Sequence, residues 1–486
     1  SSPDTGVTTF EYDLAGRQTK MVRANGLQTT FTYDLLNRPR SMTAQRPGGG
    51  TDVRTFTYDN CTNGVGRLCR IDEPHGGRQA WSYTLTGNVS IHDTVVGGTV
   101  FPHRYYYDAF DRLIRINIPG AAQVRYTYDS ASRPERVEAS WGGSVWTNAA
   151  TNIRWQPMGG PLKSLTYGNG LTLSRTYDTS GRLGRIQTPG VLDNTLGYNV
   201  GNEITSIQRA HTPTLASQSF DYDDLSRLTT VSGQGWANFS YDPNGNTVSS
   251  AIRHSPSGIA PEPQTANDVY DFMNRLIRRT TATSDVIDIT YSADGDRIAK
   301  SVNGVTTHYL VDRNNLTGYA QVFEELDPAM SVIRSYVYGL DLISQDQLLP
   351  DGLGGFEWKQ SFYLYDGLGT VRGLADASGL VTDAYFYDAW GNLINAVGQG
   401  TPNAYLFTGE QWDADLGMYF LRARYLNPAT GRFHTQDPFE GFLSDPQSLH
   451  KYLYAHANPV MFVDPSGMFR LAEIAMGMMI YTNNIQ

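Results

Sequence analysis

The chain has 486 residues, and its 38 Lys and Arg against 48 Asp and Glu give it a net charge of −10 at pH 7. This acidic balance argues against a nucleic-acid-binding protein, because neutralising phosphates requires clustered Lys and Arg. The 49 Gly and 30 Tyr residues favour many short strands joined by tight turns over helices, since Gly adopts turn conformations and Tyr packs well on a pleated sheet.

The beginning of the chain has no basic and apolar segment typical of a signal peptide. The sequence also has no apolar run of about 20 residues that could span a bilayer as a helix. Ser1 is not an initiator methionine, so we expect the chain to be a fragment or a processed product.

A repeated unit with the pattern Tyr-Asp-x-x-Gly/Asn/Ser/Asp-Arg dominates the chain. Clear copies begin at Tyr12, Tyr33, Tyr107, Tyr128, Tyr177, Tyr222 and Tyr270. Degenerate copies begin at Tyr58, Tyr241, Tyr291, Tyr365 and Tyr387. The closest copies are about 20 residues apart, a spacing typical of repeat arrays.

Each unit predicts a β-hairpin. Residues before the Tyr alternate in character, as in 28–33, which indicates a strand with one buried face. The Asp starts a turn by accepting backbone N–H groups ahead of it, and the Gly, Asn, Ser or Asp three residues later suits a left-handed turn position. Arg-Leu begins the return strand. We expect Tyr-to-Tyr stacking between successive hairpins, and hence an all-β fold built as a long antiparallel hairpin ribbon.

Two cysteines, Cys61 and Cys69, lie within one repeat. They could form a disulfide. A structural zinc site would need His75 and a further ligand, so we predict no metal and no other cofactor.

The repeat pattern changes from about residue 400. Residues 446–455 could form one or two helical turns, and residues 471–476 suggest a helical or extended apolar piece without a Tyr-Asp unit. Within this part stand five short motifs: Gly431-Arg432-Phe433, Gln436-Asp437-Pro438, Tyr452-Leu453-Tyr454, Asn458-Pro459 and Asp464-Pro465-Ser466-Gly467-Met468.

Together, the repeats and these motifs resemble the RHS/YD-repeat family with its C-terminal RHS-repeat-associated core domain. This family includes bacterial Rhs effectors, the C components of Tc toxins and, more distantly, animal teneurins. The resemblance covers nearly the whole chain. It implies a hollow shell, or cocoon, in which a β-ribbon spirals around a toxin and the core domain plugs one end. The corresponding segments are a shell over 1–400, a core over 401–468 and the start of a variable effector over 469–486.

In bacterial members the core cleaves itself after the fifth residue of an Asp-Pro-x-Gly-Leu-like motif, which here places the cut between Met468 and Phe469. Met468 departs from the family's Leu. The chain extends only about 18 residues past Met468, well below the roughly 50 residues of a small folded domain. We therefore expect the effector itself to be absent, disordered or truncated.

Peptide hydrolysis by carboxylates requires two of them in one site, one protonated and one ionised. Asp437 and Asp464 form the first candidate pair, and Asp445 could replace Asp437. Arg432 could orient a carboxylate or hold the scissile carbonyl oxygen. In the alternative interpretation each Asp-Pro step only starts a turn, and Arg432 is a structural partner of a carboxylate.

The resemblance implies a bacterial polymorphic toxin that holds its C-terminal effector and detaches it by a single-turnover, aspartic-type cut after Met468. Its partners would be the cleaved effector and a secretion or translocation component, and it would be secreted or delivered in interbacterial competition. The alternative is a teneurin-like adhesion or carbohydrate-binding protein without peptidase activity. Its binding surface, or else part of its core, would be formed by Trp81, Trp141, Trp146 and Trp236.

Overall fold

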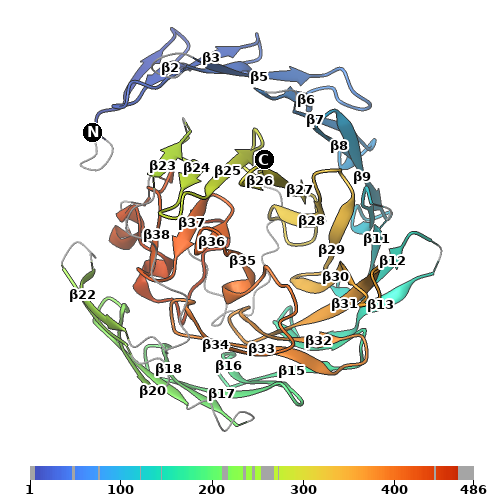
Figure 1. Cartoon of the computed structure of the whole chain (residues 1–486), viewed down its shortest axis with the longest axis vertical. Helices are drawn as coiled ribbons and strands as arrows, with labels where there is room; N and C mark the ends of the chain where they lie inside the picture. The colour runs from blue at the N-terminus through green and yellow to red at the C-terminus, as the bar shows by residue number, and fades with distance from the viewer. Residues whose placement is uncertain are drawn as a thin grey trace.

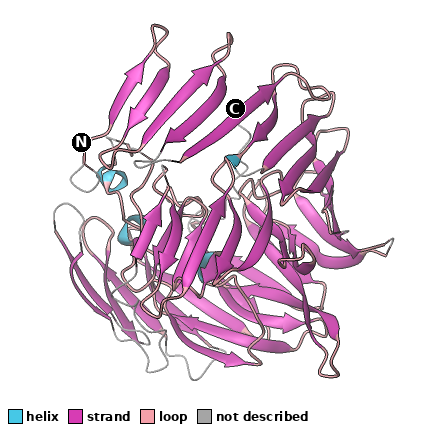
Figure 2. Ribbon diagram, turned by 45° about the horizontal axis from the view of Figure 1, so that its top comes forward, coloured by secondary structure: helices cyan, strands magenta, loops and turns pink. Residues whose placement is uncertain are grey.

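A computed structural model describes residues 6–45, 50–74, 77–120, 122–143, 145–210, 217–233, 237–242, 247–252, 267–271, 273–439, 441–442 and 445–468. The described part is built almost entirely from antiparallel strands, each of which pairs with its neighbours in sequence. The predicted fold, a long hairpin ribbon that spirals into a shell, is confirmed (Figures 1 and 2).

The first 22 strands form one continuous sheet that traces the outer arc in Figure 1, from blue to green. They are β1 (Thr9–Tyr12), β2 (Gln18–Val22), β3 (Gln28–Tyr33), β4 (Pro39–Gln45), β5 (Thr51–Tyr58), β6 (Leu68–Asp72), β7 (Arg78–Tyr83), β8 (Val89–Val96), β9 (Thr99–Tyr107), β10 (Leu113–Asn117), β11 (Ala122–Tyr128), β12 (Pro134–Trp141), β13 (Thr147–Trp155), β14 (Leu162–Tyr167), β15 (Thr172–Tyr177), β16 (Leu183–Thr188), β17 (Leu192–Tyr198), β18 (Ile204–Arg209), β19 (Gln218–Tyr222), β20 (Leu228–Gly233), β21 (Ala237–Tyr241) and β22 (Thr247–Ile252).

A second sheet of 12 strands continues the spiral inside the first in this view. Its strands are β23 (Asn267–Tyr270), β24 (Leu276–Thr280), β25 (Val286–Tyr291), β26 (Arg297–Val302), β27 (Val305–Asp312), β28 (Gln321–Leu326), β29 (Val332–Tyr338), β30 (Leu342–Pro350), β31 (Phe356–Tyr365), β32 (Val371–Asp376), β33 (Val381–Tyr387) and β34 (Leu393–Gly398).

A small sheet of four strands lies within the spiral (Figure 1). It consists of β35 (Gln411–Asp413), β36 (Met418–Leu421), β37 (Arg424–Asn427) and β38 (Arg432–Phe433). Three short 3-10 helices accompany it: η2 (Phe407–Gly409), η3 (Pro446–Leu449) and η4 (Ala455–Ala457). The η3 helix confirms one helical turn within residues 446–455, whereas η4 begins only at the last of these residues. Residues 471–476 lie outside the described part. No helix among the described residues has the length and apolar character needed to cross a bilayer.

The repeat at Asp178 shows how the motif makes its turn. Asp178 Oδ1 accepts the backbone N–H groups of Ser180 and Arg182, both at 2.9 Å, and its Oδ2 accepts Arg182 Nε at 2.7 Å. Gly181 has φ 79°, in the left-handed region. At the same turn position, non-glycine residues with φ between 59° and 65° are Asn37, Asp111, Ser132, Ser226 and Asn274. The predicted turn chemistry is therefore confirmed.

Successive hairpins are joined by alternating Arg and Tyr side chains, and the prediction of Tyr-to-Tyr stacking is wrong for this seam. The Arg182 guanidinium lies over the Tyr198 ring, 4.6 Å from its centroid, and donates to Asn202 of the next turn at 3.0 Å. The Tyr198 hydroxyl donates to the Leu183 carbonyl at 2.8 Å. An Arg on a ring face gains cation–π attraction and keeps its N–H groups for the turns on either side, which a second Tyr could not do.

Every clear repeat from Tyr12 to Tyr270, except that of Tyr107, shifts the strand register immediately before its Tyr. Examples are the steps 32–33, 127–128 and 176–177. The Tyr107 hairpin shifts on its return strand instead, after Leu113. Such bulges increase the right-handed twist and bend the strand that carries them. Because they recur next to the same turn of each hairpin, their bends add up along the ribbon and favour a spiral.

Consecutive turns of the spiral touch through pairs about 200 residues apart in sequence. The Tyr105 hydroxyl donates to Asp312 at 2.5 Å, 207 residues away, and Asn169 donates to the Asp376 carbonyl at 2.9 Å, also 207 residues away. The largest buried apolar cluster includes Val124, Tyr336 and Tyr454, and so joins both turns with the terminal segment. The terminal segment is therefore packed against the shell.

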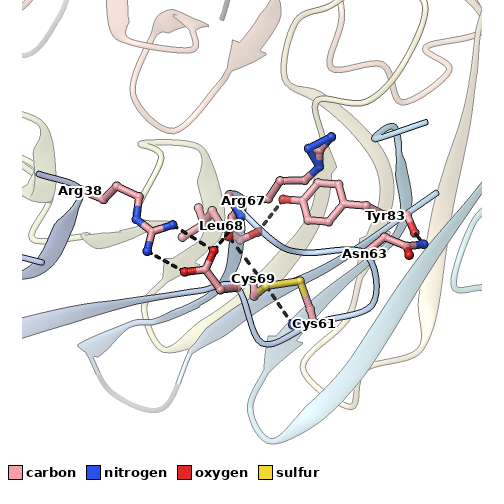
Figure 3. Close-up of a disulfide and its surroundings, with 9 residues drawn as sticks. Arg38, Cys61, Asn63, Arg67, Leu68, Cys69 and Tyr83 are labelled. Atoms are coloured by element: carbon pink, nitrogen blue, oxygen red, sulfur yellow. Dashed lines mark hydrogen bonds and ion pairs between the residues drawn. A yellow bond between two sulfur atoms is a disulfide. The ribbon is translucent and has the colours of Figure 1, made fainter. Parts of the chain in front are cut away.

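The cysteines staple one enlarged turn, between β5 and β6. Cys61 and Cys69 are joined by a disulfide (Figure 3). The stapled loop holds the next hairpin, because Asn63 donates to the Tyr83 carbonyl at 2.9 Å and the Tyr83 N–H donates to Thr62 at 3.1 Å. The sequence allowed a disulfide or, with His75 and a further ligand, a zinc site, and the structure has the disulfide. His75 lies outside the described residues.

We expect Tyr198→Phe to lower the free energy of unfolding by about 1 kcal/mol, because it removes one hydroxyl bond across the seam and leaves a carbonyl acceptor unpaired. Chemical denaturation of the purified chain measures this. Tyr12 holds the same position in the first repeat but is 60% exposed. Tyr12→Phe should therefore change stability by less than about 0.5 kcal/mol. Equal effects at the two positions would contradict the proposed role of the seam.

Candidate active site

The candidate site forms where the last described turn, residues 464–468, packs on the hairpin of β36 and β37. The Ala423 N–H donates to the Ser466 carbonyl at 3.2 Å, and Arg424 Nε donates to the Gly467 carbonyl. Gly467 has φ 68°, and a Cβ there would lie 2.2 Å from the Leu421 carbonyl oxygen. Only glycine allows both this backbone conformation and this close approach.

Arg424 brings the two predicted aspartates together. Its Nη2 lies 2.7 Å from Asp437 Oδ2 and 3.5 Å from Asp464 Oδ2. Its Nη1 donates at 3.0 Å to the carbonyl of Lys451, which also accepts the Asp437 N–H at 2.8 Å. Two carboxylates that come from segments 27 positions apart in sequence therefore share a single guanidinium nitrogen.

Asp464 also contacts the segment that ends in the predicted cleavage position. Its Oδ1 accepts the Met468 N–H at 3.0 Å and the Ser466 hydroxyl at 3.0 Å. This is the hydrogen-bonding pattern of an Asp that starts a turn. Asp464 therefore has the turn role of the alternative interpretation and also lies beside Arg424. Phe469, on the other side of the predicted cut, lies outside the described residues.

Burial controls the ionisation of the pair. Asp464 is 3% exposed, and loss of hydration raises its pKa to about 6, with Asp437 adding to the rise and Arg424 opposing it. Burial also raises the pKa of Asp437, against the closer Arg424 charge. Of the two carboxylates, Asp464 lies farther from the cation, so it is the one more easily kept protonated.

A cavity of about 170 Å³ opens beside these groups and is lined by Arg424, Asp437, Asp464 and Met468. Asp445 lines the same cavity, with its Oδ2 3.9 Å from His456 Nδ1. Thus three of the predicted acidic residues and the predicted cleavage position border one space that can hold water molecules.

Arg432 is placed differently. Its strand neighbour Phe433 packs against Arg424, whose Cζ lies 3.6 Å from the ring centroid. Successive side chains on a strand point to opposite faces, so Arg432 points away from Arg424. The cation between the carboxylates is therefore Arg424, which belongs to none of the motifs named from the sequence. The available signal was an Arg inside the apolar alternation of residues 418–427, with no acidic residue among its immediate neighbours.

The tryptophans of the alternative interpretation are partly covered where the structure describes them. Trp81 stacks on His92 with ring centroids 5.1 Å apart, and Trp146 lies under the Arg125 guanidinium at 4.3 Å. Trp141 is 37% exposed. Trp236 lies outside the described residues.

Asp464 should make stability fall as pH rises. In the unfolded chain its carboxyl loses its proton near 3.8, and in the folded chain near 6. The folded state holds the extra proton between these values, so stability is lost across that window, by about 2–3 kcal/mol. We expect Asp464→Asn to remove this loss. Chemical denaturation of both proteins at a series of pH values measures it; parallel curves would contradict the expectation.

The RHS Repeat family model matches residues 12–51. The chain is 32% identical over 275 residues to the tRNA3(Ser)-specific nuclease WapA of Bacillus spizizenii. This match covers 56% of this chain and 10% of that protein. It is 24% identical to the double-stranded DNA deaminase toxin A of Burkholderia cenocepacia, over 94% of this chain and 39% of that protein. The chain thus spans a tenth to two fifths of these relatives.

Among solved structures, the crystal structure of TcdB2-TccC3-Cdc42 superposes with a TM-score of 0.81 at 17% identity, over 96% of this chain and 28% of the matched chain. At this identity the similarity concerns the fold, and it extends over both turns of the spiral and the terminal segment. Repeats, relatives and fold agree. The chain therefore contains RHS repeats, and its fold is similar to that of RHS/YD-repeat proteins along nearly its whole length.

Proposed function

We propose that this chain is the shell and core of a bacterial polymorphic toxin, which encloses a C-terminal effector and detaches it by cutting its own chain after Met468. The observation that carries the proposal is the placement of Asp437 and Asp464 on one buried guanidinium, with Asp464 bonded to the Met468 N–H. In this proposal residues 1–400 form the shell, 401–468 the core, and 469–486 begin the effector.

The two carboxyl groups would divide the chemistry. Protonated Asp464 donates to the Met468 carbonyl oxygen, while ionised Asp437, held by Arg424, takes a proton from a water molecule in the cavity. The water oxygen attacks the carbonyl carbon, the C–N bond to Phe469 breaks, and the departing nitrogen receives the proton that Asp437 took from the water. Met468 then ends in a carboxylate and Phe469 begins with an amine.

A single turnover suffices for this task. The bond is part of the same chain as the acid and the base, so its effective concentration is high and modest acid–base catalysis is adequate. The reaction uses only side chains and water, and so needs no cofactor.

The relatives support a shell with variable contents. One is a tRNA nuclease and another a DNA deaminase by name, yet both match this chain. We infer that the matched part performs a task common to both, namely enclosing the effector. Its partners are then the detached effector and a translocation component, and the assembly acts outside the cell that makes it, in competition between bacteria.

Intact-mass measurement with amino-terminal sequencing tests the proposal on the purified chain. We expect two products, one ending at Met468 and one beginning at Phe469, and no cut in denaturant. A folded chain that stays whole at pH about 5, where Asp464 is protonated, would reject self-cleavage. It would favour the alternative, an adhesion or carbohydrate-binding protein without peptidase activity.

A further inference from the structure

Arg422, in the loop between β36 and β37, holds the turn that precedes the proposed cut. Its Nη1 donates to the Pro465 carbonyl. Ala423, also in the loop, and Arg424, the first residue of β37, bind the next two carbonyls of the turn, through the Ala423 N–H to Ser466 and Arg424 Nε to Gly467. These three residues thus fix three successive peptide groups leading to Met468.

The same guanidinium also reaches the shell. Its Nε donates to the Ala320 carbonyl at 3.0 Å, and its Nη2 donates to Gln321 Oε1, at the start of β28, at 3.3 Å. It lies over the Tyr319 ring at 5.2 Å from the centroid. These residues lie about 100 positions before Arg422 in sequence and belong to the inner turn of the spiral.

A third set of contacts keeps the side chain in this position. Glu410, 6% exposed, accepts Arg422 Nη1 with both carboxylate oxygens, at 2.9 and 2.8 Å. A buried pair of this kind can adopt few arrangements, because the other N–H groups of the guanidinium must also find acceptors. Here those acceptors are the shell and the cleavage turn.

The backbone of Arg422 points to a role for its side chain. Arg422 has φ 55° at the first position of a two-residue hairpin loop. That conformation favours glycine in such loops and is strained for other residues. Backbone geometry therefore does not explain an arginine at this position, whereas its contacts with three segments do.

We propose that Arg422 is a positioning residue that makes cleavage depend on the docking of the core onto the shell. This rests on the self-cleavage proposed above. With the inner turn in place, Ala320 and Gln321 orient the guanidinium so that it holds Pro465, and the turn presents Met468 to the carboxylates. Without these shell contacts the turn, which includes Asp464, is free to move away from Asp437. Cleavage before the shell has formed, which would release the effector unenclosed, is thereby suppressed.

The test is the rate of cleavage of the whole chain after cell-free synthesis, followed by intact mass over time. Arg422→Lys keeps a charge for Glu410 but cannot bridge all the acceptors, and we expect cleavage to slow about tenfold. Gln321→Ala removes one shell contact and should slow it about fivefold. The pH dependence of the rate should stay unchanged in both variants, because the carboxylates and Arg424 remain.

Arg334 offers matched controls in the inner turn. It binds Glu325 at 3.1 Å and Gln347 Oε1 at 3.3 Å. Arg334→Lys and Gln347→Ala therefore make the same chemical changes in a cluster outside the cleavage turn, and both should cleave at the wild-type rate. Thermal unfolding of all four variants verifies that they are folded.

Slower cleavage in the Arg422 and Gln321 variants alone supports the inference. Wild-type rates in all four variants, with Asp464→Asn still blocked, would overturn the inference and leave the proposed function standing. Equal slowing in all four would also overturn it, because the effect would then be a general loss of stability. An altered pH dependence in Arg422→Lys would mean that Arg422 acts on the carboxylates directly. A wild-type chain that stays whole overturns the proposed function and this inference with it.

Discussion

Asp464→Asn should leave the bond between Met468 and Phe469 uncut. An amide cannot supply a proton to the scissile carbonyl, although it still accepts the Met468 N–H through its oxygen and keeps the turn. Removing one member of a catalytic pair typically lowers the rate by a factor of about a thousand or more. Intact mass of the purified variant, after incubation at pH about 5, should show a single whole chain.

Asp327 provides the matched control for this variant. It also stands in an Asp-Pro step, and its Oδ1 accepts the N–H of Ser331, four residues on, at 2.9 Å, as Asp464 does for Met468. No guanidinium in the described part of the chain pairs with it, so Asp327→Asn should cleave like the wild type. Cleavage of Asp464→Asn at the wild-type rate would reject Asp464 as the acid and leave only its turn role.

Arg297→Met should destabilise the chain by about 3–5 kcal/mol, the largest stability effect that we expect. Arg297 on β26 lies fully buried, with Nη1 2.6 Å from Asp413 Oδ2 and Nη2 2.6 Å from Gln411 Oε1. Its loss leaves Asp413 buried, and Lys300, at 2.9 Å, is then the one cation among the described residues that pairs with it. Asp413 and Gln411 belong to β35, so the variant also loosens the small sheet from the shell.

Arg278→Met, on the neighbouring part of the same sheet, is the comparison. Arg278 pairs with Asp288, but the two side chains are 54% and 42% exposed. Exposed pairs contribute less than about 1 kcal/mol because water screens them. Chemical denaturation of both variants measures the difference. Similar small losses would mean that the Arg297 pair does not hold the small sheet in place.

The hairpins could be predicted because each repeat contains its own turn chemistry. Asp178, Gly181 and Arg182 lie within five residues and satisfy one another's hydrogen bonds. The ribbon seam was predicted less well. The spacing of Tyr and Arg places both at the turn, but only the bulge before Tyr198 brings its ring under Arg182 rather than against another Tyr.

The candidate site, like the ribbon, could be predicted from the sequence only in part. Asp437 and Asp464 could be named from the motifs around them, and the structure places both at one cavity. The cation between them could not be identified from the sequence. Arg432 and Arg424 lie eight positions apart on neighbouring strands, and the sequence does not say which of the two faces the carboxylates. Strand alternation turns Arg432 away, and the packing of the 464–468 turn selects Arg424.

The sequence by itself determined the local structure of this protein: Tyr-Asp turns with left-handed corners, antiparallel strands between them and Asp-Pro turns in the terminal segment. These features follow from interactions among residues a few positions apart. Only the tertiary structure decided which distant segments meet, such as Tyr105 with Asp312 or Arg422 with Gln321. Those contacts depend on the curvature summed over many hairpins, and no single repeat specifies that sum.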